Sequence, residues 1–502
     1  MSADASALVR SIAASNRDVP RTTPGARQDC SDVLHLTFFF DGTGNNRDED
    51  GALQKWSNVA RLFDAARDDN SNGIYAVYTS GVGTPFNGAV PLTDKIDVWR
   101  EDHLFGAMAG DGGERRLSKR DTDFSAALAQ ALVVNARKQG GELARIANEN
   151  QNESFEKLNR ALAGHRLIKV INISIFGFSR GAALARAFAN RLLERCSASR
   201  DGSMSMDGYP VRFVFMGLFD TVASFGLPAQ NMTLPFEDRE LKIPSCVERC
   251  VHFVAAHELR FSFPVDLIRD NGRYRPGMIE KVYPGVHSDV GGGYAANEQG
   301  VSDSYARIPL NDMLAESLSS GVRLMSLDEL KASRATIAHR FAVDDKTRQS
   351  YQQYTMNIGG QSLTVEESIK RHMQMFYSSC GTLSRNKQPI VGGQSLQDSF
   401  IKRQMWAGID EEAPAYAEAL EGNKSVVLSG QRIFFYTFKP EAWKLRAWET
   451  NAATSTIEFF AHYVHNSKVD FVLNSEPFSY FRSRGVNEQH SKQLAHGASG
   501  GW

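Results

Sequence analysis

The segment that most restricts the fold of this chain is Gly177-Phe178-Ser179-Arg180-Gly181, which has the pattern G-x-S-x-G. The mainly apolar run Leu167–Phe176 leads into it, and the helix-favouring, alanine-rich stretch Ala182–Leu193 follows it. Between a strand and a helix this pattern predicts a nucleophile elbow, a strained turn that lifts its serine above the end of a sheet. Gly177 and Gly181 stand where side chains would collide in such a turn. Ser179 is therefore the expected nucleophile.

A second match to the pattern, Gly497–Gly501, lacks this context. With 41 glycines in 502 residues, the pentapeptide arises by chance in about one such chain in four. No strand-like run precedes the second match, and it lies in the last few residues of the sequence, where fraying is expected. Only the match around Ser179 has the context of a functional elbow.

The alternation of apolar runs with helix-like stretches predicts an α/β-hydrolase-like fold, with a mostly parallel sheet and helices on both faces. The predicted strands are Leu34–Phe40, Ile74–Tyr78, Leu167–Phe176, Val211–Phe219, Val251–Ala255 and Ile279–Tyr283. Because 502 residues are too many for one core, we expect several parts. These are a flexible arm at 1–30, a catalytic domain at 31–325 and a mainly helical C-terminal subdomain at 326–502, which could face a membrane or a partner. Charged residues at 100–165 predict an insertion that could act as a lid.

A serine hydrolase of this fold needs an acid and then a histidine after the serine, each at a strand end. Asp220 ends the run Val211–Phe219 and is the expected acid, although capping the next helix would also explain it; Glu258 and Asp266 are reserves. His287 follows the last predicted strand and precedes three glycines, which allow close backbone approach. We therefore expect His287 to be the general base.

The oxyanion of the reaction needs N–H donors. The backbone N–H of Arg180 lies at the positive end of the helix that follows Ser179. A loop after the first strand offers the amides of Gly42 and Thr43 as the second half of the hole. Asp41-Gly42-Thr43 also resembles the nucleophile loop of aspartyl phosphatases, but Phe39 stands where the partner acid of that site would be.

Composition excludes several other classes. The chain has 57 Lys+Arg against 58 Asp+Glu, so no basic footprint for nucleic acid is present, and its longest apolar runs fall short of the roughly 18 residues of a spanning helix. The N-terminus lacks the pattern of a signal peptide, so we expect synthesis in the cytoplasm. Five scattered cysteines predict free thiols. His257-Glu258 begins like a zinc-protease helix, but Phe261 replaces the second histidine, and we expect neither a metal nor an organic cofactor.

Several segments, in order along the chain, resemble the catalytic domain of the first family of type VI secretion lipase effectors. They are Phe38–Asn46, Ser57–Leu62, Thr79–Thr84, Gly177–Ala182, Phe219–Val222 and Gly285–Tyr294. The segments Phe460–Ser467 and Tyr480–Arg484 resemble the closing segments of that family, although Asn466 stands where an aspartate is usual. The resemblance thus covers nearly the whole chain.

The resemblance implies a bacterial phospholipase A that cleaves glycerophospholipids at the first or second acyl position. It implies Ser179, Asp220 and His287 as the triad, loading on the secretion spike, action in the periplasm of a target cell and a cognate immunity protein. The residues alone are equally compatible with a general carboxylesterase, which would use the same groups. A non-catalytic interaction protein with a vestigial hydrolase fold would have lost part of this set, and no part is lost here.

One amphipathic stretch has two interpretations. Its apolar residues, with Lys402 and Arg403 beside them, are spaced along one side of a predicted helix, which could lie in the headgroup region of a bilayer. Such a stripe is more often part of a core. The residues are Leu396, Phe400, Ile401, Met405, Trp406 and Ile409.

Overall fold

The computed structural model describes residues 32–84, 109–162, 165, 167–200, 203–225, 232–233, 241–359, 363–386, 396–427, 437–468 and 479–489. Its centre is an eight-stranded sheet with the order β11-β9-β6-β3-β1-β2, in which these six strands run parallel. Two short strands extend it: β5 (Met204–Met206) pairs antiparallel with β6, and β4 (Ser197–Ala198) pairs antiparallel with β5. The six parallel strands are β1 (Val33–Phe40), β2 (Ile74–Thr79), β3 (Val170–Phe178), β6 (Tyr209–Phe219), β9 (Cys250–Ala255) and β11 (Met278–Tyr283).

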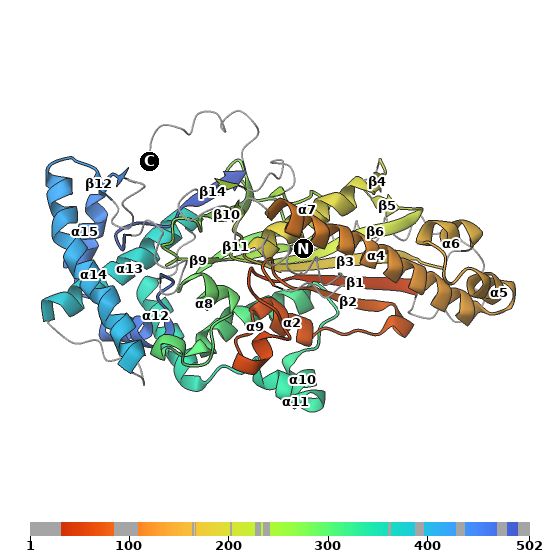
Figure 1. The fold of residues 1–502 in the computed structure, drawn as a ribbon, viewed down its shortest axis with the longest axis horizontal. Coiled ribbons are helices and arrows are strands. Elements are labelled where there is room, and N and C mark those ends of the chain that lie inside the picture. Colours follow the sequence, from red (N-terminus) through yellow and green to blue (C-terminus); the bar gives the residue numbers. More distant parts are fainter. Residues whose placement is uncertain are drawn as a thin grey trace, which may run out of the picture.

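Helices cover both faces of this sheet, as predicted (Figure 1). Helices α4 (Ala109–Gln139) and α7 (Arg180–Glu194) lie on one face, and α2 (Asn58–Asp64) and α9 (Arg307–Ser319) lie on the other. The C-terminal helices gather at one end of the molecule (Figure 1). They are α12 (Asp345–Ile358), α13 (Val365–Asn386), α14 (Leu396–Glu421), α15 (Ala442–Glu449) and α16 (Thr454–Tyr463).

The run of three phenylalanines in β1 explains why this strand lies in the middle of the sheet. Phe38 and Phe40 pack against Phe188 of α7, with ring centroids 4.8 and 5.4 Å apart. Phe39 points to the opposite face and stacks on Phe176 of β3 at 5.0 Å. A parallel strand between two helical layers is buried on both faces. Each of these rings contributes about 1.5–3 kcal/mol through burial.

The predicted insertion forms α4, α5 (Gly141–Glu149) and α6 (Phe155–Ala161). The side chains of Phe124, Leu128 and Leu132 in α4 are fully buried, in the same hydrophobic cluster as side chains of β1 and β3. Arg116 of the same helix donates to the carbonyls of Ser80 and Gly81, in the turn after β2. In its described part the insertion is therefore a layer of the core, and residues 85–108, together with the predicted arm at 1–30, lie outside the described residues.

The C-terminal part shares a hydrophobic core with the end of the sheet. Val254 and Val265 belong to the same buried cluster as residues of α13 and α16. Strand β14 (Val486–Gln489) pairs in parallel with β10 (Val265–Asp270). Ile409 of α14 is fully buried, as the core interpretation of the amphipathic stretch requires. The side chains of its other five apolar residues lie outside the described set. Among the described residues no helix is long and apolar enough to cross a membrane.

The topology singles out one end of the sheet as a binding crevice. Strand β2 lies on one side of β1. Strand β3 lies on the other side of β1, and β6, β9 and β11 follow beyond β3. The strand order therefore reverses between β1 and β3. In open parallel sheets ligands bind beyond the carboxyl ends of the strands at such a point, where the loop after β1 and the turn after β3 meet.

Candidate active site

Ser179 occupies the sharp turn between β3 and α7. Its backbone angles, φ 58° and ψ −128°, are rare for a residue with a side chain and are typical of strain held at functional sites. The two flanking glycines allow the turn. A Cβ at Gly177 would lie 2.5 Å from Ala182 Cα, and one at Gly181 would lie 2.2 Å from the carbonyl oxygen of Asp41. The predicted elbow is thus present in the backbone.

Asp220 and His287 form the contact predicted from the sequence. The Nδ1 atom of His287 lies 2.5 Å from Asp220 Oδ2, which confirms this pairing. Of the two reserve acids, Glu258 accepts a hydrogen bond from the backbone N–H of His287 at 3.2 Å and Asp266 accepts one from the N–H of Ala223 at 2.7 Å. Neither reserve takes the place of Asp220 on the imidazole.

Backbone contacts bring these residues to the same end of the sheet. The N–H of Ser179 donates to the carbonyl of Phe219, next to Asp220. The ring of Phe178 lies 4.7 Å from that of His287. A Cβ at Gly291, four residues after His287, would lie 1.9 Å from a ring atom of Phe178. The glycines after His287 therefore allow the close approach that the sequence predicted.

Apolar rings surround the imidazole of His287. Phe178 lies on one side, and Phe263 contacts the ring edge-on at 5.1 Å. Burial lowers the pKa of His287 below its ordinary 6.5, although hydrogen bonding to Asp220 and its charge act in the opposite direction. His287 is therefore neutral near pH 7. With its Nδ1 directed at Asp220, its Nε2 can accept a proton.

Arg484 lies 264 residues after Asp220. The resemblance had marked its segment, but the sequence did not indicate its contact with Asp220. Arg484 Nη1 and Nη2 donate to the two oxygens of Asp220 at 2.5 and 2.8 Å, and both side chains of the pair are fully buried. Burial alone would raise the pKa of Asp220, but Arg484 and His287 outweigh it and hold that pKa well below its usual range. The N–H of Ala255 completes the set of donors at 2.8 Å. Every acceptor position of the carboxylate is thus in use.

The C-terminal part supplies two further residues to the surroundings of His287. His465 Nδ1 lies 2.5 Å from Asp289 Oδ1, and Asp289 also accepts from the N–H of Val286 at the start of α8 (His287–Gly291). Ser467 donates to Glu258 at 2.9 Å. The resemblance had marked the segment Phe460–Ser467, which contains both residues, but only the structure shows which acids they bind.

The loop after β1 packs directly against the elbow. A Cβ at Gly42 would lie 2.5 Å from Phe178. Asp41 holds the loop, because its carboxylate accepts from the N–H of Gly42 at 2.7 Å and from the hydroxyl of Tyr78 at 2.5 Å. Burial raises the pKa of Asp41 to about 6. With both oxygens engaged and only 2% of its surface exposed, Asp41 supports the loop.

These contacts change one part of the predicted oxyanion hole. The N–H of Gly42 is occupied by Asp41 and does not point at an oxyanion in this structure. Thr43 follows it, and its hydroxyl is buried with no hydrogen-bond partner among the described residues. Arg180 is the first residue of α7, so its amide lies at the helix N-terminus as predicted.

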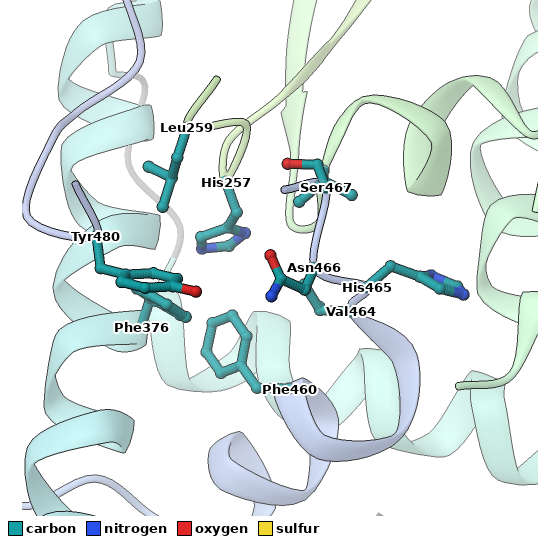
Figure 2. A pocket seen from close by; sticks show the side chains of 10 residues that line it. His257, Leu259, Phe376, Phe460, Val464, His465, Asn466, Ser467 and Tyr480 are labelled. Atoms are coloured by element: carbon teal, nitrogen blue, oxygen red, sulfur yellow. The ribbon is translucent and has the colours of Figure 1, made fainter. Parts of the chain in front are cut away.

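The histidine of the rejected zinc motif has a structural role. His257 Nδ1 accepts from the N–H of Gly285 at 2.8 Å, and its Nε2 lies 3.1 Å from the carbonyl of His372. Beside it lies a cavity of about 20 Å³ between the catalytic and C-terminal parts, lined by His257, Val286, Phe376, Phe460 and Tyr480 among others (Figure 2). This space fits about one water molecule and is too small for an acyl chain.

Comparisons with known proteins show which family and which solved structures this chain is similar to. The model of the family described as "T6SS, Phospholipase effector Tle1-like, catalytic domain" matches residues 35–207 and 195–316, more than half of the chain. An uncharacterized protein from Pseudomonas aeruginosa has a similar crystal structure, with a TM-score of 0.66, 24% identity, and coverage of 97% of this chain and 82% of that one. The Tle1 effector bound to the VgrG spike of the type 6 secretion system gives a TM-score of 0.37, at 18% identity over 68% of this chain and 83% of that chain. No curated protein matches.

Proposed function

Because this chain belongs to the Tle1-like family of type VI secretion phospholipase effectors, we propose that it is a serine hydrolase that cleaves acyl ester bonds of membrane glycerophospholipids. The nucleophile is Ser179, the general base is His287 and the acid that orients it is Asp220. The observation that carries the proposal is the strained elbow at Ser179 combined with the 2.5 Å contact between His287 and Asp220. Family membership supplies the substrate class.

The chemistry follows from these positions. His287 Nε2 takes the proton of the Ser179 hydroxyl as its oxygen attacks the ester carbonyl, and Asp220 stabilises the imidazolium through Nδ1. The amides of Arg180 and Thr43 stabilise the oxyanion. His287 then protonates the departing lysophospholipid oxygen, which leaves an acyl group on Ser179. Water, deprotonated by His287, releases the fatty acid and restores the serine.

The same family supports a biological setting. We propose that the protein travels on the spike of the type VI apparatus, acts on phospholipids from the periplasm of a rival cell, and is neutralised in its own cell by an immunity protein. A general carboxylesterase remains the second candidate function, because the proposed residues attack any ester of suitable shape.

Product analysis tests the proposed reaction. We expect the purified protein to convert vesicle phospholipids that carry a different isotope label on each acyl chain into one free fatty acid and one lysophospholipid, in equal amounts by mass spectrometry. The label that is released identifies the acyl position. Diacylglycerol or phosphatidic acid as the product would contradict the proposal, since either would require cleavage at the phosphate. Hydrolysis of short esters without any attack on lipid would favour the carboxylesterase.

The pH dependence tests His287 as the base. His287 accepts a proton only when it is neutral, and burial holds its pKa below 6.5. We expect kcat/KM on a neutral short ester to decrease at acidic pH with a midpoint below 6.5, and to approach a loss of about tenfold per pH unit below that midpoint. A series of rate measurements from about pH 4 to about pH 8 covers this range. A midpoint above 6.5 would show that another group controls the rate.

A further inference from the structure

A second cavity lies beside α2, α9 and α11 (Ala335–His339), and its lining does not include Ser179 or its neighbours. Its volume is about 170 Å³, more than ten times the space that one water molecule needs. A group of several non-hydrogen atoms therefore fits. The lining includes Arg61, Arg307, Arg340, His339, Trp56 and Thr336, and it includes no carboxylate.

The charges behind this lining are unequal. Asp303 pairs with both Arg61 and Arg307, at 3.6 and 2.8 Å. Asp64 pairs with both Arg340 and Arg47. Arg47 also pairs with Asp48 at 3.1 Å. Three carboxylates are thus shared among four guanidinium groups, so the cluster formed by these seven residues keeps an excess of one positive charge around the cavity. Fixed cationic groups lining a concave site attract anions.

Two of these arginines also have unused donors. The Nε atoms of Arg61 and Arg307 are buried and have no hydrogen-bond partner among the described residues. Arg61 is 1% exposed, and burial together with the neighbouring Arg307 lowers its pKa to about 10. A buried donor without a partner costs free energy. A ligand that brings negative charge and several acceptor oxygens would offset the unbalanced positive charge of these side chains.

We propose that this cavity binds a phosphate group. Phosphate oxygens match the planar fork of guanidinium donors, and the negative charge of a phosphate group would balance the excess charge of the cluster. One fork is already oriented, because the guanidinium of Arg340 lies 3.7 Å from the ring centroid of Trp56. The phosphate can come from a lipid headgroup or from a free phosphate compound. The proposal does not depend on the hydrolase reaction.

The site is connected to the helix that begins with His287. Asn58, at the start of α2, donates to the carbonyl of Val290 in α8 at 2.9 Å. Its Oδ1 accepts from Nη1 of Arg61 at 3.2 Å. A phosphate that binds Arg61 is therefore linked to α8 through Asn58, because Asn58 is hydrogen-bonded both to Arg61 and to α8.

Calorimetric titration of the full chain with inorganic phosphate tests the proposal. We expect saturable binding, weakened roughly tenfold or more in Arg307→Gln and in Arg340→Gln, since each removes a charge-assisted donor. Thr336→Glu keeps every arginine but adds a carboxylate to the cavity, and we expect it to abolish phosphate binding without lowering the melting temperature. Arg348→Gln, which changes an exposed arginine of α12, is the matched control and should bind as the wild type does.

The result that would overturn the proposal is an absence of saturable binding, or equal affinity in Thr336→Glu and the wild type. Thr336→Glu keeps the test valid if an arginine variant fails to fold. Vesicles identify the source of the phosphate. If phosphatidylglycerol vesicles bind, inorganic phosphate competes with them and Thr336→Glu weakens both, then the ligand is a lipid headgroup. If only inorganic phosphate binds at the cavity, then the ligand is a free phosphate compound.

Discussion

Alanine in place of Ser179 is expected to lower the turnover of phospholipid by roughly 10⁵- to 10⁶-fold, the size of effect found when a nucleophile is removed from a serine hydrolase. Ser179 begins the turn into α7, and its hydroxyl makes no helix-capping hydrogen bond. The substitution removes one oxygen atom. The backbone contacts that stabilise the turn do not involve this oxygen, so they also stabilise it with alanine at position 179. We therefore expect little change in the melting temperature.

The control for this experiment is Ser174→Ala. Ser174 is a buried serine of the same strand, β3, so its removal tests the general effect of deleting a hydroxyl from this strand. The rate on a soluble ester, the rate on vesicles and thermal unfolding are the measurements. A folded Ser179→Ala protein that retains near-wild-type turnover would show that another residue attacks the ester. If Ser179→Ala fails to fold while Ser174→Ala folds, Ser179 has a structural role.

Methionine in place of Arg484 is expected to lower the free energy of unfolding by about 3–5 kcal/mol, because it leaves the charge of Asp220 buried without its partner. It should also change catalysis. Arg484 donates to both oxygens of Asp220 and offsets part of the negative charge of this carboxylate. Without Arg484, more of that charge stabilises protonated His287. The pKa of His287 then rises, and the acid limb of kcat/KM moves to higher pH.

Two further variants separate positioning from simple stability. Arg484→Lys keeps the charge but loses the bidentate fork, so it should recover part of the stability and keep the acid limb near its wild-type position. Arg212→Met removes a bidentate pair with Glu248 at the opposite end of β6, and should leave the pH profile unchanged. If Arg484→Met lowers stability without moving the acid limb, Arg484 is a structural residue only. If Arg484→Met does not fold, Arg484→Lys is the deciding variant. We expect it to lower turnover at unchanged pH dependence, because it loses the fork that orients Asp220.

The link between Arg484 and Asp220 also changes how the C-terminal part is understood. The sequence predicted residues 326–502 as a subdomain that could face a membrane or a partner. In the structure Arg484, His465 and Ser467 of this part each bind a buried acid close to His287. The residues that surround the proposed base therefore come both from the middle of the chain and from its C-terminal part, so we expect the proposed site to require the C-terminal segment.

The sequence by itself determined the elements and their chemistry. Apolar runs bounded by glycine and polar residues specified the parallel strands to within a few residues, because burial between two helical layers requires continuous apolar side chains. The elbow was recognisable because only glycine fits at positions 177 and 181, where a Cβ would meet backbone atoms at 2.5 and 2.2 Å. Asp220 and His287 followed from the rule that catalytic side chains stand at strand ends.

Only the tertiary structure decided the contacts between distant segments. The pairing of Arg484 with Asp220 and the four arginines shared by Asp64 and Asp303 have no signature in the sequence, since a charged residue reads as solvent-exposed until its partner is known. The Gly42 amide was predicted as an oxyanion donor because its type and position were right, but the direction of one N–H bond depends on where Asp41 places its carboxylate. Patterns along the chain carry periodicity and spacing, and the direction of a donor or the sharing of a charge arises only when the segments pack together.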